Sequence, residues 1–395
     1  MTTARLRPPP LSWRWPLTAG FLALTPVALT LIALVSVSEA FPQPVDVSAF
    51  APAGADLLQG QWARIYSDSF IQAGPFELAF WGITELLHVH TALQWQLVVV
   101  LGSALAGLVL GVVVERILRP ITAAWSPVLA AAATLLGAVT TMLTTAISSG
   151  HPAEVAIPLL WLGSGMMARR DRPFTAAVLL GLSTGWELWG VLGAAVLLLA
   201  PRIDLRMLWR SALGVLAPIA LIFLPFLLLG PFQMFSFHWT IYSGTLAELL
   251  FPHATTFSWP MRLVQAALSL GGGAVAALVL RRHAAALWIV PLASCAIRLF
   301  LDPVDADYYR VPPIALVIVG MMIAVAQASA PVFVATVILL NLVVDFEQPK
   351  WLIGGLFVLA VAGTTALVAR VGQGDPPPRL PRIQQPIGAA EWKAE

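Results

Sequence analysis

The chain is poor in charged residues and has almost no cysteine. Of its 395 residues only 11% are charged and 59% are hydrophobic, whereas a soluble domain carries roughly 25% charged residues. This composition excludes an ordinary soluble protein and predicts an all-α polytopic membrane protein. The single cysteine, Cys295, excludes an internal disulfide and a cysteine metal cluster. The net charge of +2 says little, because the distribution of charge matters more than its sum in a membrane protein.

The sequence also has no clear small-residue cleavage site after its first apolar run, 18–38, which follows several arginines. We therefore expect a retained first helix rather than a cleaved signal peptide, with residues 1–17 as a cytoplasmic tail. Windows of about 20 apolar residues predict about ten transmembrane helices within one membrane domain over 18–370. The spans after the first are 94–114, 127–147, 152–168, 211–230, 259–280, 284–300, 312–328, 331–345 and 351–369.

The apolar segment 174–200 is flanked on both sides by arginines, at 169–172 and 202–210. If both basic clusters are cytoplasmic, the segment must enter and leave the membrane on the same side, and it is too short for two full crossings. We therefore predict a re-entrant helical hairpin, broken near Ser183–Gly185. One long tilted helix that violates the charge rule is the alternative.

With this hairpin in place, both termini are expected to be cytoplasmic. Most arginines then fall on the inner side, as the positive-inside rule requires. Most acids fall on the outer side or at outer helix ends. The Pro-containing C-terminal stretch, 371–395, is expected to be a disordered cytoplasmic tail.

The outer loops differ in length and composition. The first, 39–93, is the longest and the most acidic, and its residues 76–90 have the apolar spacing of an interfacial helix. His88 and His90 in this stretch are two residues apart, so a helix points them to different faces, and we predict no metal site there. The third loop, 231–258, is aromatic and suits a membrane surface.

Three stretches resemble the GT-C superfamily of integral membrane glycosyltransferases, especially actinobacterial members that use polyprenyl-phosphate sugars. The first is GADLLQGQWARIYSD with the following QAGPFELAF, in the long first loop. The second is SSGHPAEVAIPLLWLGSGMMARRDRPFTAAVLLGLSTGWELWGVL, 148–192, and the third is DADYYRVPPIALVI, 305–318. The layout of 18–330 is similar to that of the superfamily, but each motif is short.

This resemblance implies sugar transfer at the extracytoplasmic face of the plasma membrane. The donor would be a polyprenyl-phosphate sugar and the acceptor a lipid or a glycan of the cell envelope; no nucleic acid is expected as a partner. The phosphate is already a leaving group, so the reaction needs a base for the acceptor hydroxyl and cations or hydrogen-bond donors for the phosphate. No cofactor is required, although a divalent metal is compatible with this chemistry.

Asp56 is the predicted general base, because it lies in the first loop close to the end of the first helix. Asp68 and Glu187 are candidates for a second acid or a cavity residue. Asp68 also fits helix capping, and Glu187 stands between Trp186 and Trp189 at membrane depth, where an acid needs a cavity or a partner. The candidates for binding the phosphate or the acceptor are Arg310, His253, His238, Tyr309 and Arg64.

Most of these candidates have an ordinary structural alternative. Arg310 can pair with Asp305 or Asp307, and Arg298, near the outer end of its span, can reach the headgroups instead of a ligand.

A transporter or flippase and a non-catalytic membrane scaffold are the competing functions. A transporter predicts polar residues through the middle of several helices, whereas several predicted spans carry almost no charge. A scaffold predicts no converging acid and cation. The glycosyltransferase predicts that Asp56, Arg310 and the third loop meet around one cavity.

Overall fold

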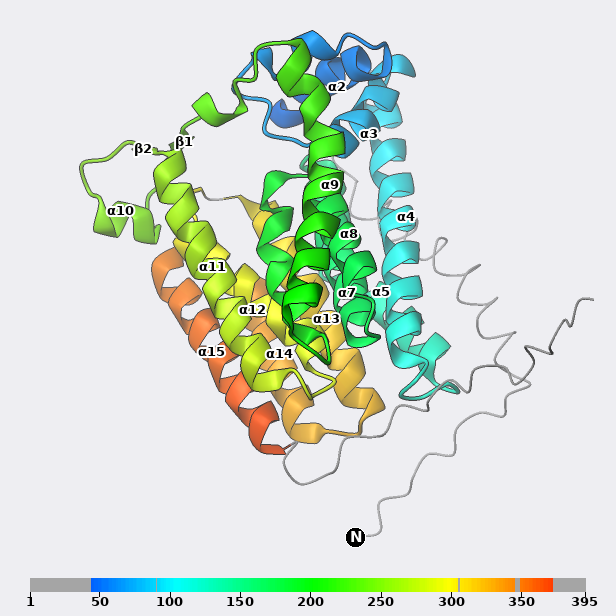
Figure 1. Ribbon diagram of the computed structural model, residues 1–395. Coiled ribbons are helices and arrows are strands. Elements are labelled where there is room, and N and C mark those ends of the chain that lie inside the picture. Colours follow the sequence, from blue (N-terminus) through cyan, green and yellow to red (C-terminus); the bar gives the residue numbers. More distant parts are fainter. Residues whose placement is uncertain (1–43, 90, 305, 345–348, 372–395) are drawn as a thin grey trace, which may run out of the picture.

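The computed structural model describes residues 44–89, 91–304, 306–344 and 349–371. Its elements carry the labels of Figure 1. The predicted first span at 18–38, both predicted tails, and the positions of His90 and Asp305 lie outside the described residues.

The described chain folds into a helical bundle (Figure 1). Each predicted span within it coincides with helix, as apolar runs of this length require when no water is present to satisfy the backbone. Those helices are α4 (Ala92–Leu118), α5 (Ser126–Val139), α6 (Met142–Ser148), α7 (Ala153–Arg169), α9 (Leu205–Leu229), α11 (Trp259–Leu280), α12 (Ala286–Leu301), α13 (Val311–Ala326), α14 (Ala330–Val344) and α15 (Lys350–Val371).

By length and composition, five helices of the described chain can cross a membrane, or six if a bent pair is one span. The five are α4, α9, α11, α15 and the continuous run of η5 (Asp307–Arg310) with α13. Leucines on α9 such as Leu221 and Leu228 are largely exposed, which suits contact with lipid. The helical membrane protein that the composition predicts is therefore supported, while the total of ten spans and the cytoplasmic termini stay predictions.

The predicted span 127–147 is not one straight helix. Helices α5 and α6 meet at an angle of 54°. Between them Thr141 takes a left-handed conformation, with φ of 55°, which an α-helix cannot continue through. No Gly or Pro stands at this point to signal the bend.

The segment 174–200 breaks where the sequence suggested. Helix α8 (Pro173–Ser183) ends there, and a 3-10 helix, η3 (Leu188–Leu199), follows after a short turn. The carbonyl of Gly190 accepts hydrogen bonds from Ser183 Oγ at 3.0 Å and from Trp161 Nε1 at 2.7 Å, so α7, α8 and η3 are joined at one point. That both arms enter from one side of a membrane stays a prediction.

The first loop forms two helices, α2 (Val45–Leu58) and α3 (Pro75–Leu86), with a short 3-10 helix, η2 (Trp62–Ser67), after α2. They lie at one end of the bundle, the top of Figure 1, and we call this the loop end. Helix α3 buries Leu78 and Trp81, whereas Ile83 and Leu87 of the predicted apolar face are exposed. An exposed apolar face is what a helix at the membrane interface presents to lipid.

The aromatic segment 231–258 also joins the loop end. It contains η4 (Met234–Ser236), β1 (Trp239–Thr240), α10 (Leu246–Leu250) and β2 (Thr256–Phe257), with β1 and β2 antiparallel and Trp239 opposite Phe257. The amide of Gln233 donates to the carbonyl of Tyr66 at 2.7 Å, and that of Tyr242 donates to the carbonyl of Pro303 at 2.9 Å. The first and third predicted outer loops therefore assemble together with the segment around Pro303.

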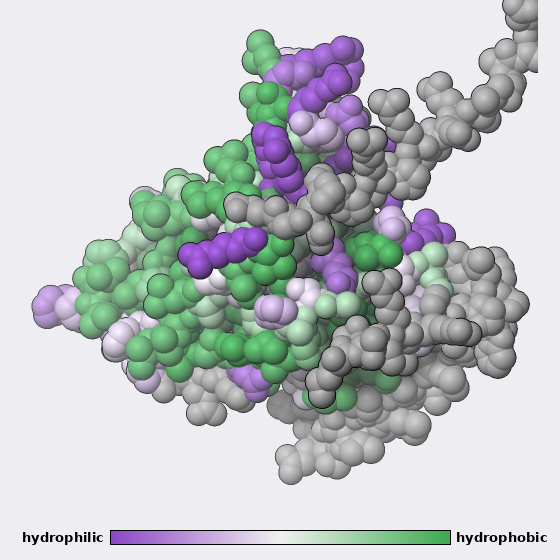
Figure 2. Space-filling view, turned by 90° about the horizontal axis from the view of Figure 1, so that it is seen from below, coloured by the Kyte–Doolittle hydropathy of each residue, from purple (hydrophilic) through white to green (hydrophobic). Residues whose placement is uncertain are grey.

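The opposite end of the bundle holds the connections between α4 and α5, α7 and α8, and α11 and α12 (Figure 1). These connections are rich in arginine, and Arg169 joins two of them by donating to the carbonyl of His283 at 2.7 Å. Figure 2 shows the molecule from this side, with hydrophobic residues over much of the described surface and hydrophilic residues in smaller groups. The arginines of these connections lie at the end opposite the loop end, which fits the predicted charge asymmetry.

We expect Gly74→Ala to destabilise the fold, because the chain before α3 lies against the turn after α8. A Cβ at Gly74 would lie 2.6 Å from the carbonyl carbon of Gly185 and 2.7 Å from the carbonyl oxygen of Trp186. Overpacking of this kind costs about 1–3 kcal/mol, measurable as a lower thermal unfolding midpoint in detergent. Gly271→Ala is the control, because its Cβ meets nothing within 4 Å in helix α11. An equal effect of both substitutions would contradict the expectation.

Candidate functional site

His151 lies at the loop end in the connection between α6 and α7. Helix α6 ends in a Schellman turn: the amide of Gly150 donates to the carbonyl of Ile147, and the amide of His151 donates to that of Ala146. Gly150 has φ of +91°, which only glycine adopts without strain. Trp81 of α3 fixes the same turn by donating from Nε1 to the carbonyl of Gly150 at 2.8 Å. The local sequence thus sets the imidazole in one place.

Two carboxylates reach His151 from segments that pair with each other. The amide of Gly74 donates to the carbonyl of Trp186 at 2.6 Å, and that of Phe76 donates to Gly185 at 2.8 Å. This short ladder places Glu187, in an extended conformation, beside the start of α3. Glu77 lies in the first turn of α3, where the helix dipole favours an acid.

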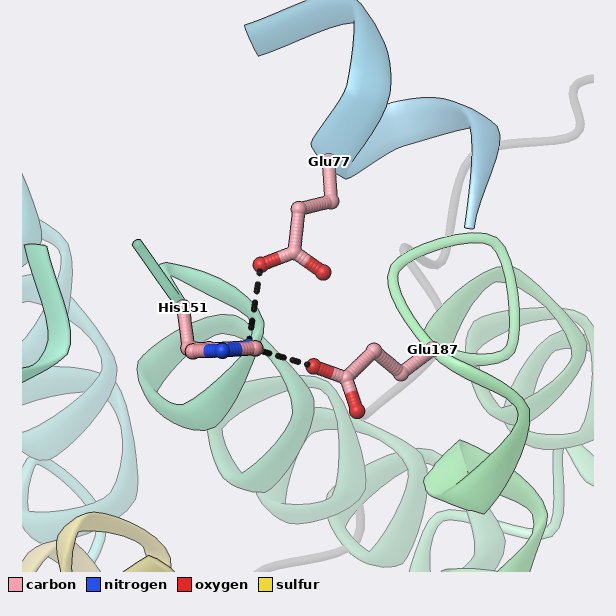
Figure 3. A group of neighbouring side chains, drawn as sticks. All are labelled: Glu77, His151 and Glu187. Carbon is pink, nitrogen blue, oxygen red and sulfur yellow. Dashed lines mark hydrogen bonds and ion pairs between the residues drawn. The ribbon is translucent and has the colours of Figure 1, made fainter. Parts of the chain in front are cut away.

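A third carboxylate, Asp46, comes from the first turn of α2. His151 Nε2 lies 2.9 Å from Asp46 Oδ2, and Nδ1 lies 3.2 Å from Glu187 Oε1 and 3.8 Å from Glu77 Oε1. Figure 3 shows the two glutamates on the same side of the ring. The side chain of Glu77 is fully buried, whereas that of Asp46 is 29% exposed. Asp46 is therefore the more accessible member of what we call the His151 cluster: Asp46, Glu77, His151 and Glu187.

The neighbouring carboxylates shift the pKa values of His151 and Glu77. Burial by itself would lower the pKa of His151, but the hydrogen bonds with Asp46 and Glu187 and the charge of Glu77 raise the pKa of the imidazole well above its ordinary value. Burial raises the pKa of Glu77, and the neighbouring charge of Glu187 raises it further.

A second ion pair lies beside the cluster. Arg298, near the end of α12, lies 3.6 Å from Glu154 in the first turn of α7, and both side chains are buried. The guanidinium stacks over Trp189 at 4.0 Å and over Tyr309 at 4.7 Å from the ring centroids. Tyr308, next to Tyr309, stacks on the ring of His151 at 3.8 Å. Tyr308 and Tyr309 of η5 thus connect the His151 cluster with the Arg298–Glu154 pair.

A third cation follows on the same side of the molecule. Arg262 of α11 binds Asp302 at 2.9 Å and stacks over Trp239 at 4.3 Å. Gln265 donates to the carbonyl of Arg298 at 3.0 Å. A cavity of about 10 Å³ lies between Arg298, Asp302 and Tyr309, room for roughly one water molecule. Acids, arginines and aromatic rings are therefore concentrated at the loop end.

The structure brings two of the predicted site residues to this region. Glu187, which lies between two tryptophans in the sequence and was expected to need a partner or a cavity, contacts the buried side chain of His151. Tyr309 lies against Arg298. Neither contact tests the role that the sequence suggested for these residues, and both roles stay predictions.

Asp56 and Asp68 lie elsewhere in the first loop. Asp56 is in helix α2, ten residues after Asp46, which corresponds to about 15 Å along the helix axis. No hydrogen bond or ion pair of the described residues joins Asp56 to Arg310. Asp68 accepts a hydrogen bond from the amide of Phe70 at 2.9 Å, an Asx turn rather than a helix cap.

The remaining predicted ligands have local roles or stand exposed. Arg310 binds Asp307 at 2.6 Å and donates to the carbonyl of Val344 at 3.2 Å, so the ion pair weighed against phosphate binding is present. Arg64 donates to Gln61 at 2.9 Å. His238 and His253 are exposed. No direct contact joins Asp56 to Arg310 among the described residues, and their meeting around one cavity stays a prediction.

Sequence reasoning did not single out Asp46, Glu77, His151 or Glu154 as site residues. Their numbers are far apart, and no motif of fixed spacing joins them. The available signal was Gly150-His151-Pro152, a turn between two apolar runs that holds a histidine, with Glu154 directly after it. No protein-family model matches this chain, and no curated protein matches it.

We expect the Arg298–Glu154 pair to show strong coupling. Arg298→Met leaves Glu154 buried without its cation, and loss of one partner of a buried pair costs about 3–5 kcal/mol. The double variant Arg298→Met/Glu154→Gln removes the stranded charge, so it should recover most of the lost thermal stability in detergent. Strictly additive losses in the two single variants and the double variant would show that the pair does not stabilise the fold.

Proposed function

We propose that this chain is a membrane glycosyltransferase that moves a sugar from a polyprenyl-phosphate donor to a lipid or cell-envelope glycan at the extracytoplasmic face of the plasma membrane. The observation that carries the proposal is the partly exposed carboxylate of Asp46, bound to His151 at the loop end of an otherwise apolar bundle. The likeness of the first loop, the 148–192 stretch and the 305–318 stretch to the GT-C superfamily supplies the reaction class.

Asp46 rather than Asp56 is the proposed general base. A base must reach the acceptor hydroxyl, and Asp46 is accessible while its carboxylate is oriented by His151. Asp46 takes the proton of the acceptor hydroxyl as that oxygen bonds to the anomeric carbon. The bond between this carbon and the phosphate oxygen breaks, and the polyprenyl phosphate leaves with the electron pair.

The leaving phosphate gains negative charge, which cations at the loop end can stabilise. Arg298 and Arg262 are the proposed cations. Aromatic rings contact both guanidinium groups, and Arg298 lies against Tyr309, next to the Tyr308 that stacks on His151. The aromatic segment 231–258 is joined to the loop end where Gln233 donates to the carbonyl of Tyr66, and it offers rings for stacking against a sugar or a prenyl chain.

Substitution of two aspartates on the same helix tests the proposal. Membranes that contain the chain are supplied with labelled polyprenyl-phosphate mannose or arabinose, and transfer to lipid and glycan is measured. Asp46→Asn should reduce transfer at least about 100-fold, as loss of a general base does. Asp56→Asn is the matched control and should retain activity within a few-fold.

The outcomes separate the base assignment from the activity. Transfer that survives Asp46→Asn and is lost in Asp56→Asn would return the base to Asp56. Absence of transfer by the unsubstituted chain from either donor would count against the glycosyltransferase itself.

A proton-coupled transporter is the second candidate. Buried acids grouped around a histidine form proton relays in transporters, and Glu77, Glu154 and Glu187 surround His151 in this way. Proteoliposomes under a pH gradient would then show proton flux that Glu77→Gln abolishes. The transferase predicts no such flux.

A further inference from the structure

Glu77, His151 and Glu187 present three donor atoms to one point. Glu77 Oε1, His151 Nδ1 and Glu187 Oε1 all lie within 4.8 Å of one another. The two glutamate oxygens face the same ring nitrogen, as Figure 3 shows. Ligands bound about 2.1 Å from a metal ion lie about 3.0–3.4 Å apart at octahedral or tetrahedral angles. The observed 3.2 and 3.8 Å from Nδ1 need only small side-chain movements to reach that geometry.

Glu77 gives independent evidence for a missing ligand. Its side chain is fully buried, and neither carboxylate oxygen meets hydrogen-bond geometry with a described residue, although Glu187 lies close enough to share a proton with it. At 3.8 Å the imidazole is too far away for a hydrogen bond. A buried carboxylate without a partner is costly in free energy, and a cation between Glu77, His151 and Glu187 would supply what it lacks.

The other nitrogen of His151 is arranged as in metal sites. Ligating histidines commonly donate their second ring N–H to a carboxylate, which fixes the tautomer and the ring orientation. Asp46 accepts from Nε2 at 2.9 Å, so a neutral His151 has its proton on Nε2 and its lone pair on Nδ1. Tyr308 stacks on the ring and holds its plane.

The surrounding charge also favours a divalent cation. Asp46, Glu77 and Glu187 contact His151, and Glu154 lies close enough to perturb the same groups. Arg298 lies 3.6 Å from Glu154 and offsets the charge of that carboxylate. A doubly charged ion would offset two of the three carboxylates that contact His151.

We propose that Glu77, His151 Nδ1 and Glu187 bind a divalent transition-metal ion of the Mn²⁺ or Zn²⁺ class, with Asp46 as the hydrogen-bond partner that orients His151. Two carboxylate oxygens and one imidazole nitrogen suit these ions. Three protein ligands leave coordination positions for water or for a phosphate oxygen. The metal site itself does not depend on the proposed transferase. Binding of the donor phosphate at the open coordination position does.

The test is metal binding by the purified full-length protein in detergent. After chelation, the protein is titrated with Mn²⁺ under electron paramagnetic resonance and, separately, with Zn²⁺ followed by elemental analysis. The unsubstituted chain should bind about one ion and gain thermal stability from it. Glu77→Gln and Glu187→Gln should each weaken binding more than about 10-fold, and Asp46→Asn should weaken it about 10–100-fold.

Glu85→Gln is the matched control, since Glu85 lies on the same helix as Glu77 but outside the cluster. It should bind metal like the unsubstituted chain. Glu187→Gln provides a second ligand variant if the buried Glu77→Gln protein does not fold.

The proposal is overturned if the unsubstituted chain binds neither ion, or if it binds no more tightly than Glu187→Gln. The cluster would then be held together by protons on His151 and Glu77. Binding is measured without donor or acceptor, so a failure to bind metal would not contradict the proposed glycosyltransferase. Conversely, a chain that binds metal but transfers no sugar would support the metal site and contradict the glycosyltransferase.

Discussion

The ring of His151 is the group on which the arrangement of the loop end depends. Carboxylates that leave water for an apolar interior need a compensating charge or hydrogen bonds. His151 supplies a contact for Asp46 on one side and for Glu187 on the other. Without this imidazole, three elements that are distant in sequence would bring like charges together with nothing between them.

Backbone hydrogen bonds fix the segments that carry these charged side chains. The positions of the charges therefore do not depend on contacts between the side chains alone. The Schellman turn sets His151, the pairing of 73–76 with 185–187 sets Glu187 and the start of α3, and Trp81 ties α3 to Gly150. Arg298 then occupies the adjoining space between Trp189 and Tyr309. A site built on several rigid segments can hold acids at short distances that a flexible loop could not maintain.

Hydropathy and charge were sufficient to predict the helices and their arginine-rich end, because apolar length and basic flanks are local properties of a sequence. The break at the end of α8 could also be predicted, since it follows from two arginine clusters and the length between them. The bend at Thr141 could not, because a threonine there has no intrinsic preference for a left-handed conformation. The depth of each helix in a membrane is likewise not a property of the isolated fold.

The site was harder to predict because it depends on which turn of α2 faces the bundle. Asp46 and Asp56 are both acids of the first loop, and the resemblance drew attention to the second. They differ by ten residues, which separates them by about 15 Å and turns them by about 80° around the helix. Only the packing of α2 on α3, and of both on the α6–α7 turn, decides that Asp46 meets His151. Glu187 could be singled out because a charge between two tryptophans already demands a partner.

The position of the cluster bears on the choice between transfer and transport. Its members lie in the first turns of α2 and α3, in the α6–α7 turn and in the turn after α8, all at the loop end. An alternating-access site is expected near the middle of the membrane, reached from both sides by polar groups along several helices. Helix α9 instead carries apolar residues along most of its length between its arginine-containing first turns and Gly230. A cluster confined to one end, with Asp46 as its accessible carboxylate, therefore favours the proposed transferase over the proposed transporter.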